Sequence, residues 1–282
     1  NCYEDGKGIE RDFSKAAFWY RAAAERDDPP AQAALSRLYE KGHGVPKDLK
    51  LAFEWIKKAS ENPNYTSAHK ALYEVGMKYL TGEGVEANPV KAFEYLEDAA
   101  KKGNINAMRD VAKLHQDGVG TPKDATKAYY WFTKAMDKGD ASAAFELGIY
   151  HEHGRGGCLV DWRKAFEMFE RAATRGCVEA LVKVARCYEH GRGVRKDWRK
   201  SAEYYEEAAH LGSIEGQYRL GLAYENGEGV DKDIEKACRW FKKAADQGYD
   251  AANKALARAS ARQVTPQLTV TVFNSPSKRA KH

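Results

Sequence analysis

One short stretch of the sequence has the residue types of a phosphate-binding loop. Gly191–Asp197 reads GRGVRKD, with two glycines and three cations directly before a helical pattern. Glycine amides and a lysine placed before a helix N-terminus can cradle a phosphate group. Similar glycine pairs occur, however, at Gly6/Gly8, Gly42/Gly44, Gly82/Gly84, Gly118/Gly120, Gly154/Gly156, Gly191/Gly193 and Gly227/Gly229. Seven phosphate loops would need seven ligands, so the glycine pairs indicate a structural joint.

A second candidate for chemistry is the sequence YHEHG, which contains His151, Glu152 and His153. Adjacent residues on a helix point in different directions, and the His-Glu-x-x-His spacing of zinc enzymes is absent. The sequence also has no Gly-x-Ser-x-Gly nucleophile motif and no dinucleotide-binding fingerprint in a strand–helix context. We therefore expect no catalytic residues, no metal site and no cofactor.

The cysteines give neither a zinc pattern nor a disulfide framework. They are odd in number, irregularly spaced and without a Cys-x-x-Cys pair. The five are Cys2, Cys158, Cys177, Cys187 and Cys238. Cys158 and Cys177 could pair within one unit, but the pattern favours reduced thiols.

Charge and hydropathy argue against two further classes of protein. The chain has 282 residues and a formal net charge of +5. Residues 263–282 carry three cations and no acid, which leaves +2 for the rest and does not suggest nucleic-acid binding. The mean hydropathy is −0.70, and no apolar run approaches the roughly 18 residues of a membrane-spanning helix.

The elements that position these residues follow from the spacing of the glycine pairs, which is 36, 40, 36, 36, 37 and 36 residues. A period in this range is typical of a solenoid of stacked units. Ala31, Leu35 and Tyr39 lie four residues apart and form one stripe of a helix, which the first glycine then ends. An acid or amide such as Asp197 follows as the N-cap of a second helix. We predict repeated helix–loop–helix units.

The repeating unit A…LG..Y..G.GV..D..KA..WF.KAA..G resembles the Sel1-like repeat, an α/α relative of the tetratricopeptide repeat. The resemblance extends over seven joints, from Asn1 to Arg262, and the chain is expected to start within a repeat. It implies an all-α, right-handed α/α solenoid (superhelix) of about seven helix pairs, whose concave face binds proteins or peptides. His115 and His151 depart from the pattern, because they replace the usual tyrosine.

Residues that the repeat does not require are candidates for partner binding. On each first helix, the positions two, three and six after the opening Ala or Gly avoid the buried stripe, and by analogy with tetratricopeptide arrays they line the concave groove. The candidates are Arg37, Tyr73, Glu74, Met77, Arg109, Lys113, Phe145, Ile149, Lys183, Arg186, Tyr218, Arg219, Lys254 and Arg258. A partly apolar centre and a cationic C-terminal half suit a peptide with apolar anchors and acidic or phosphorylated residues. Such a stripe is also typical of a solvated helix face, so both interpretations stay open.

The last twenty residues lack the repeat pattern, and we expect a basic, flexible, non-helical tail at 263–282. Leu268, Val270 and Val272 alternate with threonines, which predicts a strand-like segment at 267–273. The tail also matches a short basic nuclear-localisation or docking pattern, formed by Lys278, Arg279 and Lys281.

Asn64 begins the sequence NYT, a glycosylation sequon in a predicted loop. We expect a cytoplasmic protein, while the sequon would suit the ER lumen and the basic tail the nucleus.

The function that these patterns favour is a non-enzymatic adaptor or scaffold that binds a partner peptide or protein on the concave face. The alternative is a regulatory or activator repeat domain of a larger protein, such as a kinase, a synthase or an ER-associated degradation complex, with its other domains upstream of Asn1. Relatives named by the resemblance have both kinds of role.

Overall fold

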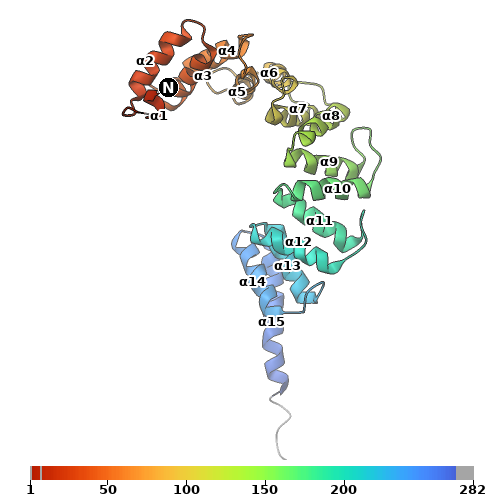
Figure 1. Ribbon diagram of the computed structural model, residues 1–282. Helices are drawn as coiled ribbons and strands as arrows, with labels where there is room; N and C mark the ends of the chain where they lie inside the picture. Colours follow the sequence, from red (N-terminus) through yellow and green to blue (C-terminus); the bar gives the residue numbers. More distant parts are fainter. Residues whose placement is uncertain (1, 7, 271–282) are drawn as a thin grey trace, which may run out of the picture. The chain divides into compact units, whose positions relative to one another are not determined.

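The computed structural model describes residues 2–6 and 8–270, in which every regular element is an α-helix (Figure 1). The helices of these residues are α1 (Cys2–Asp5), α2 (Phe13–Ala24), α3 (Pro29–Lys41), α4 (Leu49–Glu61), α5 (Ala68–Thr81), α6 (Pro89–Lys101), α7 (Ile105–Asp117), α8 (Ala125–Asp137), α9 (Ala141–His153), α10 (Trp162–Ala173), α11 (Val178–His190), α12 (Trp198–His210), α13 (Ile214–Asn226), α14 (Ile234–Asp246) and α15 (Asp250–Val270). The predicted all-α repeat fold is confirmed.

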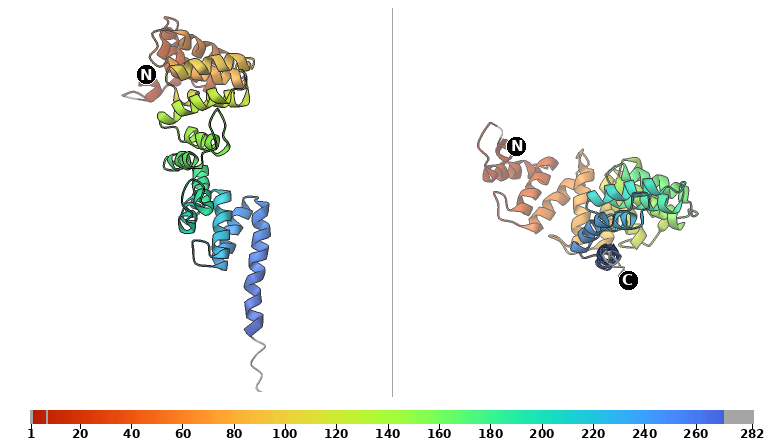
Figure 2. Two further views of the ribbon diagram at one scale, coloured as in Figure 1. Left: turned by 90° about the vertical axis from the view of Figure 1, so that its right-hand side faces the viewer. Right: turned by 90° about the horizontal axis from the view of Figure 1, so that it is seen from below.

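The chain divides into two compact units. The first comprises Asn1–Ala143 with Arg155–Cys158, and the second comprises Ala144–Gly154 with Leu159–His282. In the first unit, successive helices pack on each other from the pair α2 and α3 to the pair α7 and α8. In the second unit, the same holds from the pair α10 and α11 to the pair α14 and α15 (Figure 2). We call the odd-numbered helices from α3 to α15 the first helices and the even-numbered ones the second helices. Packing between chain neighbours is the organisation of a solenoid.

The predicted helical stripes form the core of the units. Ala31, Leu35 and Tyr39 of α3 are buried, as are Ala237 and Phe241 of α14. Alanines at the helix contacts let the backbones approach closely, and the larger side chains fill the space between successive helices. In the first unit the core includes two successive clusters, one around Leu35 and Tyr39 and the next around Val75 and Tyr79.

The two glycines of each joint have different tasks. The first, such as Gly191 at φ 69°, ends a first helix in the left-handed conformation that an L side chain rarely adopts. In five joints the second glycine lies against the preceding repeat, namely Gly44, Gly84, Gly120, Gly193 and Gly229. A Cβ atom on Gly193, for example, would be 2.0 Å from the carbonyl oxygen of Trp162, the first residue of α10. The joint therefore requires glycine for packing between repeats, which answers the question raised by GRGVRKD.

The acid or amide after each joint caps the second helix, as predicted. Asp197 accepts a hydrogen bond from the backbone N–H of Lys200 at 3.1 Å, and Asn88 accepts one from Lys91 at 3.0 Å. These side chains satisfy N–H groups that the helix itself leaves without partners. The lysines that precede the caps Asp48, Asp124, Asp197 and Asp233 therefore lie at helix starts.

Residues 263–270 differ from the expected tail. The backbone continues as α15 up to Val270, so a non-helical segment does not begin at 263, and 267–270 are not a strand. Extending an existing helix costs far less than starting one, and this outweighed the alternating pattern and the lost hydrogen bond at Pro266. The rest of the strand-like segment, 271–273, lies outside the described residues.

Two further sequence expectations concern the cysteines and the membrane. All five cysteines are free thiols, as the irregular spacing predicted. Among the described helices, none combines the length and the apolarity that crossing a bilayer requires.

Candidate partner-binding surface

The fourteen candidate residues lie on the first helices, and we call them the first-helix surface. None of them is buried. Five are exposed, namely Arg37, Glu74, Lys113, Lys254 and Arg258. The others are half-buried, and they are Tyr73, Met77, Arg109, Phe145, Ile149, Lys183, Arg186, Tyr218 and Arg219. The side chains thus avoid the core stripe, as their register predicted.

In the first unit, this surface is held by contacts between successive repeats. The Tyr73 hydroxyl donates a hydrogen bond to Oδ2 of Asp110 at 3.0 Å. Burial, together with the nearby Asp110 carboxylate, raises the pKa of Tyr73 to about 12, so the phenol stays a hydrogen-bond donor. Arg109 Nη1 donates to Oδ2 of Asp140 at 2.9 Å, which ties α7 to the cap of α9.

A buried lysine also joins two repeats of the first unit. The Lys78 side chain is 7% exposed, and its Nζ lies 3.2 Å from Oε1 of Glu40 and 3.7 Å from Oε2 of Glu83. Two carboxylates around one ammonium group offset the loss of its hydration. Lys78 lies on α5 and Glu40 on α3, so the pair links neighbouring first helices.

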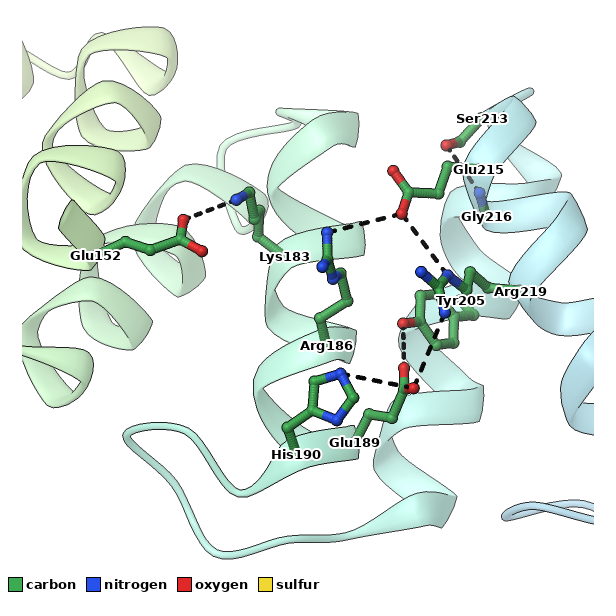
Figure 3. A network of polar contacts seen from close by, with 10 residues as sticks. All are labelled: Glu152, Lys183, Arg186, Glu189, His190, Tyr205, Ser213, Glu215, Gly216 and Arg219. Carbon is green, nitrogen blue, oxygen red and sulfur yellow. Dashed lines mark hydrogen bonds and ion pairs between the residues drawn. The ribbon is translucent and has the colours of Figure 1, made fainter.

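In the second unit, the cations pair with carboxylates in a repeating arrangement (Figure 3). Lys183 on α11 donates to Oε2 of Glu152 on α9 at 2.7 Å. One repeat further, Arg219 on α13 lies 4.0 Å from Oε1 of Glu189 on α11. Glu152 and Glu189 hold the same repeat position, as do Lys183 and Arg219, so the two pairs are equivalent.

Further contacts hold the side chains of this network in place. Glu215 Oε1 lies 3.7 Å from Arg219 Nε and 3.9 Å from Arg186 Nη1 (Figure 3). The Tyr205 hydroxyl donates to Oε2 of Glu189 at 2.6 Å. Burial and this carboxylate raise the pKa of Tyr205, which keeps its proton on the phenol. Each cation therefore faces a negative partner that is already in place.

The most buried carboxylate lies at the C-terminal end of the network. Glu225 on α13 has a side chain that is 1% exposed. Arg258 donates to it from Nε at 3.0 Å and from Nη2 at 2.5 Å, and Arg262 donates from Nη1 at 2.7 Å. Two guanidinium groups thus hold one carboxylate and join α13 to α15.

Sequence reasoning selected the cations and missed the acids that hold them. Glu40, Glu152, Glu189 and Glu225 each follow the aromatic residue that closes the stripe of a first helix. The recurring dipeptides Tyr-Glu and His-Glu were the available signal. Because the cations have acidic partners, the C-terminal half carries less free positive charge than the list of cations implies. Recognition of an acidic peptide there stays a prediction.

Three candidate cations form no ion pair with any described residue: Arg37, Lys113 and Lys254. All three side chains are exposed, on α3, α7 and α15. These side chains can approach an acidic partner without first giving up an intramolecular carboxylate. Substitutions of these three residues therefore test partner binding on the first-helix surface most directly.

The remaining candidate sites lie elsewhere. Asn64 is exposed in the loop between α4 and α5, where its backbone N–H donates to Oδ1 of Asn62 at 3.0 Å, and its glycosylation stays a prediction. Lys278, Arg279 and Lys281 lie outside the described residues. Within residues 2–6 and 8–270, no group of three or more His, Cys, Asp or Glu side chains is placed to hold a metal ion.

Comparison with known proteins gives similarities along almost the whole chain. The Sel1 repeat matches residues 1–28, 29–64, 69–104, 105–140, 141–177, 178–213 and 214–249. Comparison with curated proteins gave no match.

The solved structures that resemble the chain include two at about 30% sequence identity. The crystal structure of c5321, a protective antigen present in uropathogenic Escherichia coli strains displaying an SLR fold, has 29% sequence identity and a TM-score of 0.85. The similarity covers 93% of this chain and 55% of that one, so the chain spans about half the length of this relative. A Sel1 repeat protein from Oxalobacter formigenes has 30% identity and a TM-score of 0.65, with 77% of this chain and 85% of that chain covered.

Proteins built from Sel1 and related helical repeats are generally protein-interaction scaffolds and are typically non-catalytic. Seven successive matches, supported by the packing of helix pairs and by the glycine joints between them, place the chain among them: it belongs to the Sel1 repeat family.

Proposed function

We propose that the chain is a non-enzymatic adaptor that binds a partner protein or peptide on the first-helix surface. The observation that carries the proposal is the cross-linking of successive first helices by side chains of this surface. Tyr73 reaches Asp110, Lys183 reaches Glu152 and Arg219 reaches Glu189. A surface fixed in this way loses little side-chain freedom on binding, because its rotamers are already ordered.

The partner chemistry that suits this surface is a peptide with apolar anchors and acidic or phosphorylated residues. Met77, Phe145 and Ile149 are half-buried apolar side chains that can bury further area against an anchor. In the first unit, the exposed Arg37 and Lys113 provide charges for acidic groups of the peptide. The alternative of a regulatory domain within a larger protein uses the same surface and stays a hypothesis.

The test compares two charge-reversal variants of the whole chain. Arg37→Glu/Lys113→Glu/Lys254→Glu changes three exposed cations of the first-helix surface. The matched control reverses exposed cations of the second helices, Lys50, Arg163 and Lys242. None of the six side chains forms an ion pair with a described residue, so neither variant should disturb the fold, which circular dichroism would check.

Partners captured from source-cell extract by the wild type would be identified, purified and titrated against both variants. We expect the surface variant to bind at least tenfold more weakly and the control less than twofold more weakly. The loss should shrink at high salt, because salt screens exposed charges. Equal binding by the surface variant, or a loss in the control, would contradict the proposal.

A further inference from the structure

An exposed apolar pair lies in the joint before α10. Leu159 is 88% exposed and Val160 is 56% exposed. Leu159 has the largest exposed fraction among the large apolar residues that the structure describes. Both residues belong to the second unit. Contact between aliphatic groups and water costs free energy, which an apolar medium that covers the groups recovers. The pair is therefore a candidate contact surface.

The repeat does not require this pair. The N-caps Asp161 and Asp197 are equivalent, because the backbone N–H of each donates to the residue that closes the stripe of the preceding first helix, at 2.9 and 3.0 Å. Counted back from its cap, the pair holds two positions that include at least one charged residue in every other joint. Those residues are Glu10 and Arg11, Pro46 and Lys47, Glu86 and Ala87, Pro122 and Lys123, Arg195 and Lys196, and Asp231 and Lys232. An aliphatic pair therefore distinguishes this joint from the others.

The next joint along the chain is strongly basic. Arg192, Arg195 and Lys196 are exposed, and none of them forms an ion pair with any described residue. The single acid of this joint is Asp197, which caps α12. The joint after it, Gly227–Asp233, has two acids besides its cap and one cation, so the sign of the charge changes there. The positive charge of the basic joint is thus available to a ligand.

The structure brings the apolar pair and the basic joint together at the start of α10. The guanidinium carbon of Arg192 lies 4.6 Å from the ring centroid of Trp162, and Gly193 packs against the carbonyl oxygen of the same tryptophan. Trp162 follows Leu159 by three residues, which is at most about 11 Å of chain. We call the residues that meet here the α10–α12 edge, which comprises Leu159, Val160, Trp162, Arg192, Arg195 and Lys196.

The side chains of the two joints face the same side of the second unit. The apolar pair holds the repeat positions of Arg195 and Lys196, and equivalent positions of stacked repeats direct their side chains alike. Two aliphatic residues thus lie beside two cations on one edge. Trp162, half-buried beside them, adds an indole ring.

This combination fits the surface of an anionic bilayer. Peripheral binding to such a surface combines insertion of apolar side chains with attraction between cations and anionic lipids. Tryptophan rings favour the level of the headgroups. A nucleic acid or an acidic peptide would use the cations, but it would leave Leu159 and Val160 in water. Only a ligand that is apolar inside and anionic outside uses every part of the α10–α12 edge.

We propose that the α10–α12 edge docks the chain on an anionic lipid bilayer. Leu159 and Val160 enter the acyl region, Trp162 lies among the headgroups, and the three cations face anionic lipids. The first-helix surface is not used, so this docking is independent of the proposed adaptor function. An adaptor held in this way would present its partner at a membrane surface.

The first experiment measures flotation of the whole chain with phosphatidylcholine vesicles that contain about 30% phosphatidylserine, and with pure phosphatidylcholine vesicles. We expect binding to the anionic vesicles to be at least tenfold tighter. It should weaken at high salt, because salt screens exposed charges. Absence of binding to the anionic vesicles would overturn the proposal without requiring any variant to fold.

The second experiment locates the charges that bind the vesicles. Arg192→Glu/Arg195→Glu/Lys196→Glu should weaken binding to the anionic vesicles at least tenfold. The matched control, Arg175→Glu/Lys232→Glu/Lys242→Glu, changes the net charge equally at exposed cations elsewhere in the second unit, and should weaken binding less than threefold. Circular dichroism would check that both variants fold. Equal losses, or full binding by the edge variant through the cations of 263–282, would overturn the proposal.

The third experiment tests the apolar pair. Leu159→Ser/Val160→Ser should weaken binding to the anionic vesicles at least threefold. Leu211→Ser/Ile214→Ser replaces exposed aliphatic residues elsewhere in the second unit and should leave binding unchanged. Full binding by Leu159→Ser/Val160→Ser, together with binding of a single-stranded oligonucleotide by the wild type, would identify a polyanion site and overturn bilayer docking.

Insertion itself is tested with Leu159→Trp and vesicles whose acyl chains carry bromine, which quenches tryptophan emission on contact. Quenching should be stronger than in the wild type, whereas Leu211→Trp should show no such increase. Equal quenching in the two variants would contradict insertion of the pair. None of these measurements needs a captured protein partner, so failure of the adaptor function and failure of bilayer docking are distinguishable.

Discussion

Glu40 in the first unit and Glu225 in the second hold the same repeat position but have different surroundings. The Glu40 side chain is 37% exposed, and its partner Lys78 is nearly buried. Glu225 is itself almost fully buried, and its partners Arg258 and Arg262 are about half exposed. The buried member is therefore the cation in one unit and the carboxylate in the other.

This difference separates two properties of a repeat. At Glu40, Glu152, Glu189 and Glu225 the repeat position brings an acid to the next first helix, whereas Leu80 and Gln116 hold it elsewhere. Local packing then decides which partner of each pair loses its water. A buried charge depends on its partner, but an exposed charge keeps its hydration when the partner is removed. Substitutions in the two units should therefore have unequal effects.

The largest loss of stability is expected from substitutions in the core, where the two units have equivalent buried residues. Leu35 and Leu147 hold the same position in α3 and α9, and both are buried. Leu35→Ala and Leu147→Ala should each lower the free energy of unfolding by about 2–5 kcal/mol, because each leaves a cavity. Equilibrium urea unfolding would measure it. A change below about 0.5 kcal/mol at either site would show that the assigned core register is wrong.

The next effect should come from the second unit. Arg258→Ala/Arg262→Ala leaves the Glu225 carboxylate buried without a counter-charge. We expect a loss of about 2–4 kcal/mol, below the full cost of breaking a buried pair because both guanidinium groups are half exposed. The control is Arg239→Ala, which removes an exposed pair with Glu235 and should cost under about 1 kcal/mol. Equal losses in the two variants would show that the buried Glu225 carboxylate depends on its partners no more than an exposed acid does.

Acid sensitivity should be similar in both units, since each has one buried histidine in the aromatic position. Burial lowers the pKa of His115 and of His151, and a nearby lysine adds to the effect in each case. For His115, Lys127 opposes protonation, while Asp124 and Glu97 partly favour it. The unfolded chain therefore binds protons more readily, and stability should fall as the pH drops below about 6.5.

Urea unfolding at pH 7.5 and pH 5 would measure this dependence. His115→Tyr restores the usual aromatic residue and should reduce the loss of stability at pH 5. The control is His153→Gln, which replaces an exposed histidine. It should leave the pH dependence of stability unchanged. An unchanged pH dependence in His115→Tyr would contradict this account.

The smallest effect is expected in the first unit. Lys78→Met replaces the buried ammonium group with an apolar chain of similar length, and leaves Glu40 and Glu83 about half exposed. Replacing a buried ion pair with an apolar residue is often close to neutral, so the free energy of unfolding should change by less than about 1 kcal/mol. A loss comparable to that of Arg258→Ala/Arg262→Ala would show that both units depend equally on their pairs.

Much of the fold could be predicted from the sequence because its signals are local and repeated. The stripe Ala31, Leu35 and Tyr39, the glycine joints and the capping acids each depend on residues within one helix or one loop. The extension of α15 to Val270 was not predicted. The alternating apolar residues and Pro266 indicated a non-helical segment, whereas the existing helix continues through them.

The candidate surface was predictable only in part. The register placed Lys183, Arg219 and Arg258 outside the core, but it did not show the acids that hold them. Those acids belong to the preceding repeat, 30 or more residues away, and a pair at that separation is visible only when the helices are stacked.

The sequence by itself determined the all-helical repeat, its period and the positions that face the core, because each follows from periodicity and from backbone rules for glycine, proline and capping residues. Only the tertiary structure decided which charges are neutralised and which partner of each pair is buried. Those properties depend on the distances between side chains of successive repeats and on the access of water to them. The sequence of a single repeat determines neither of these.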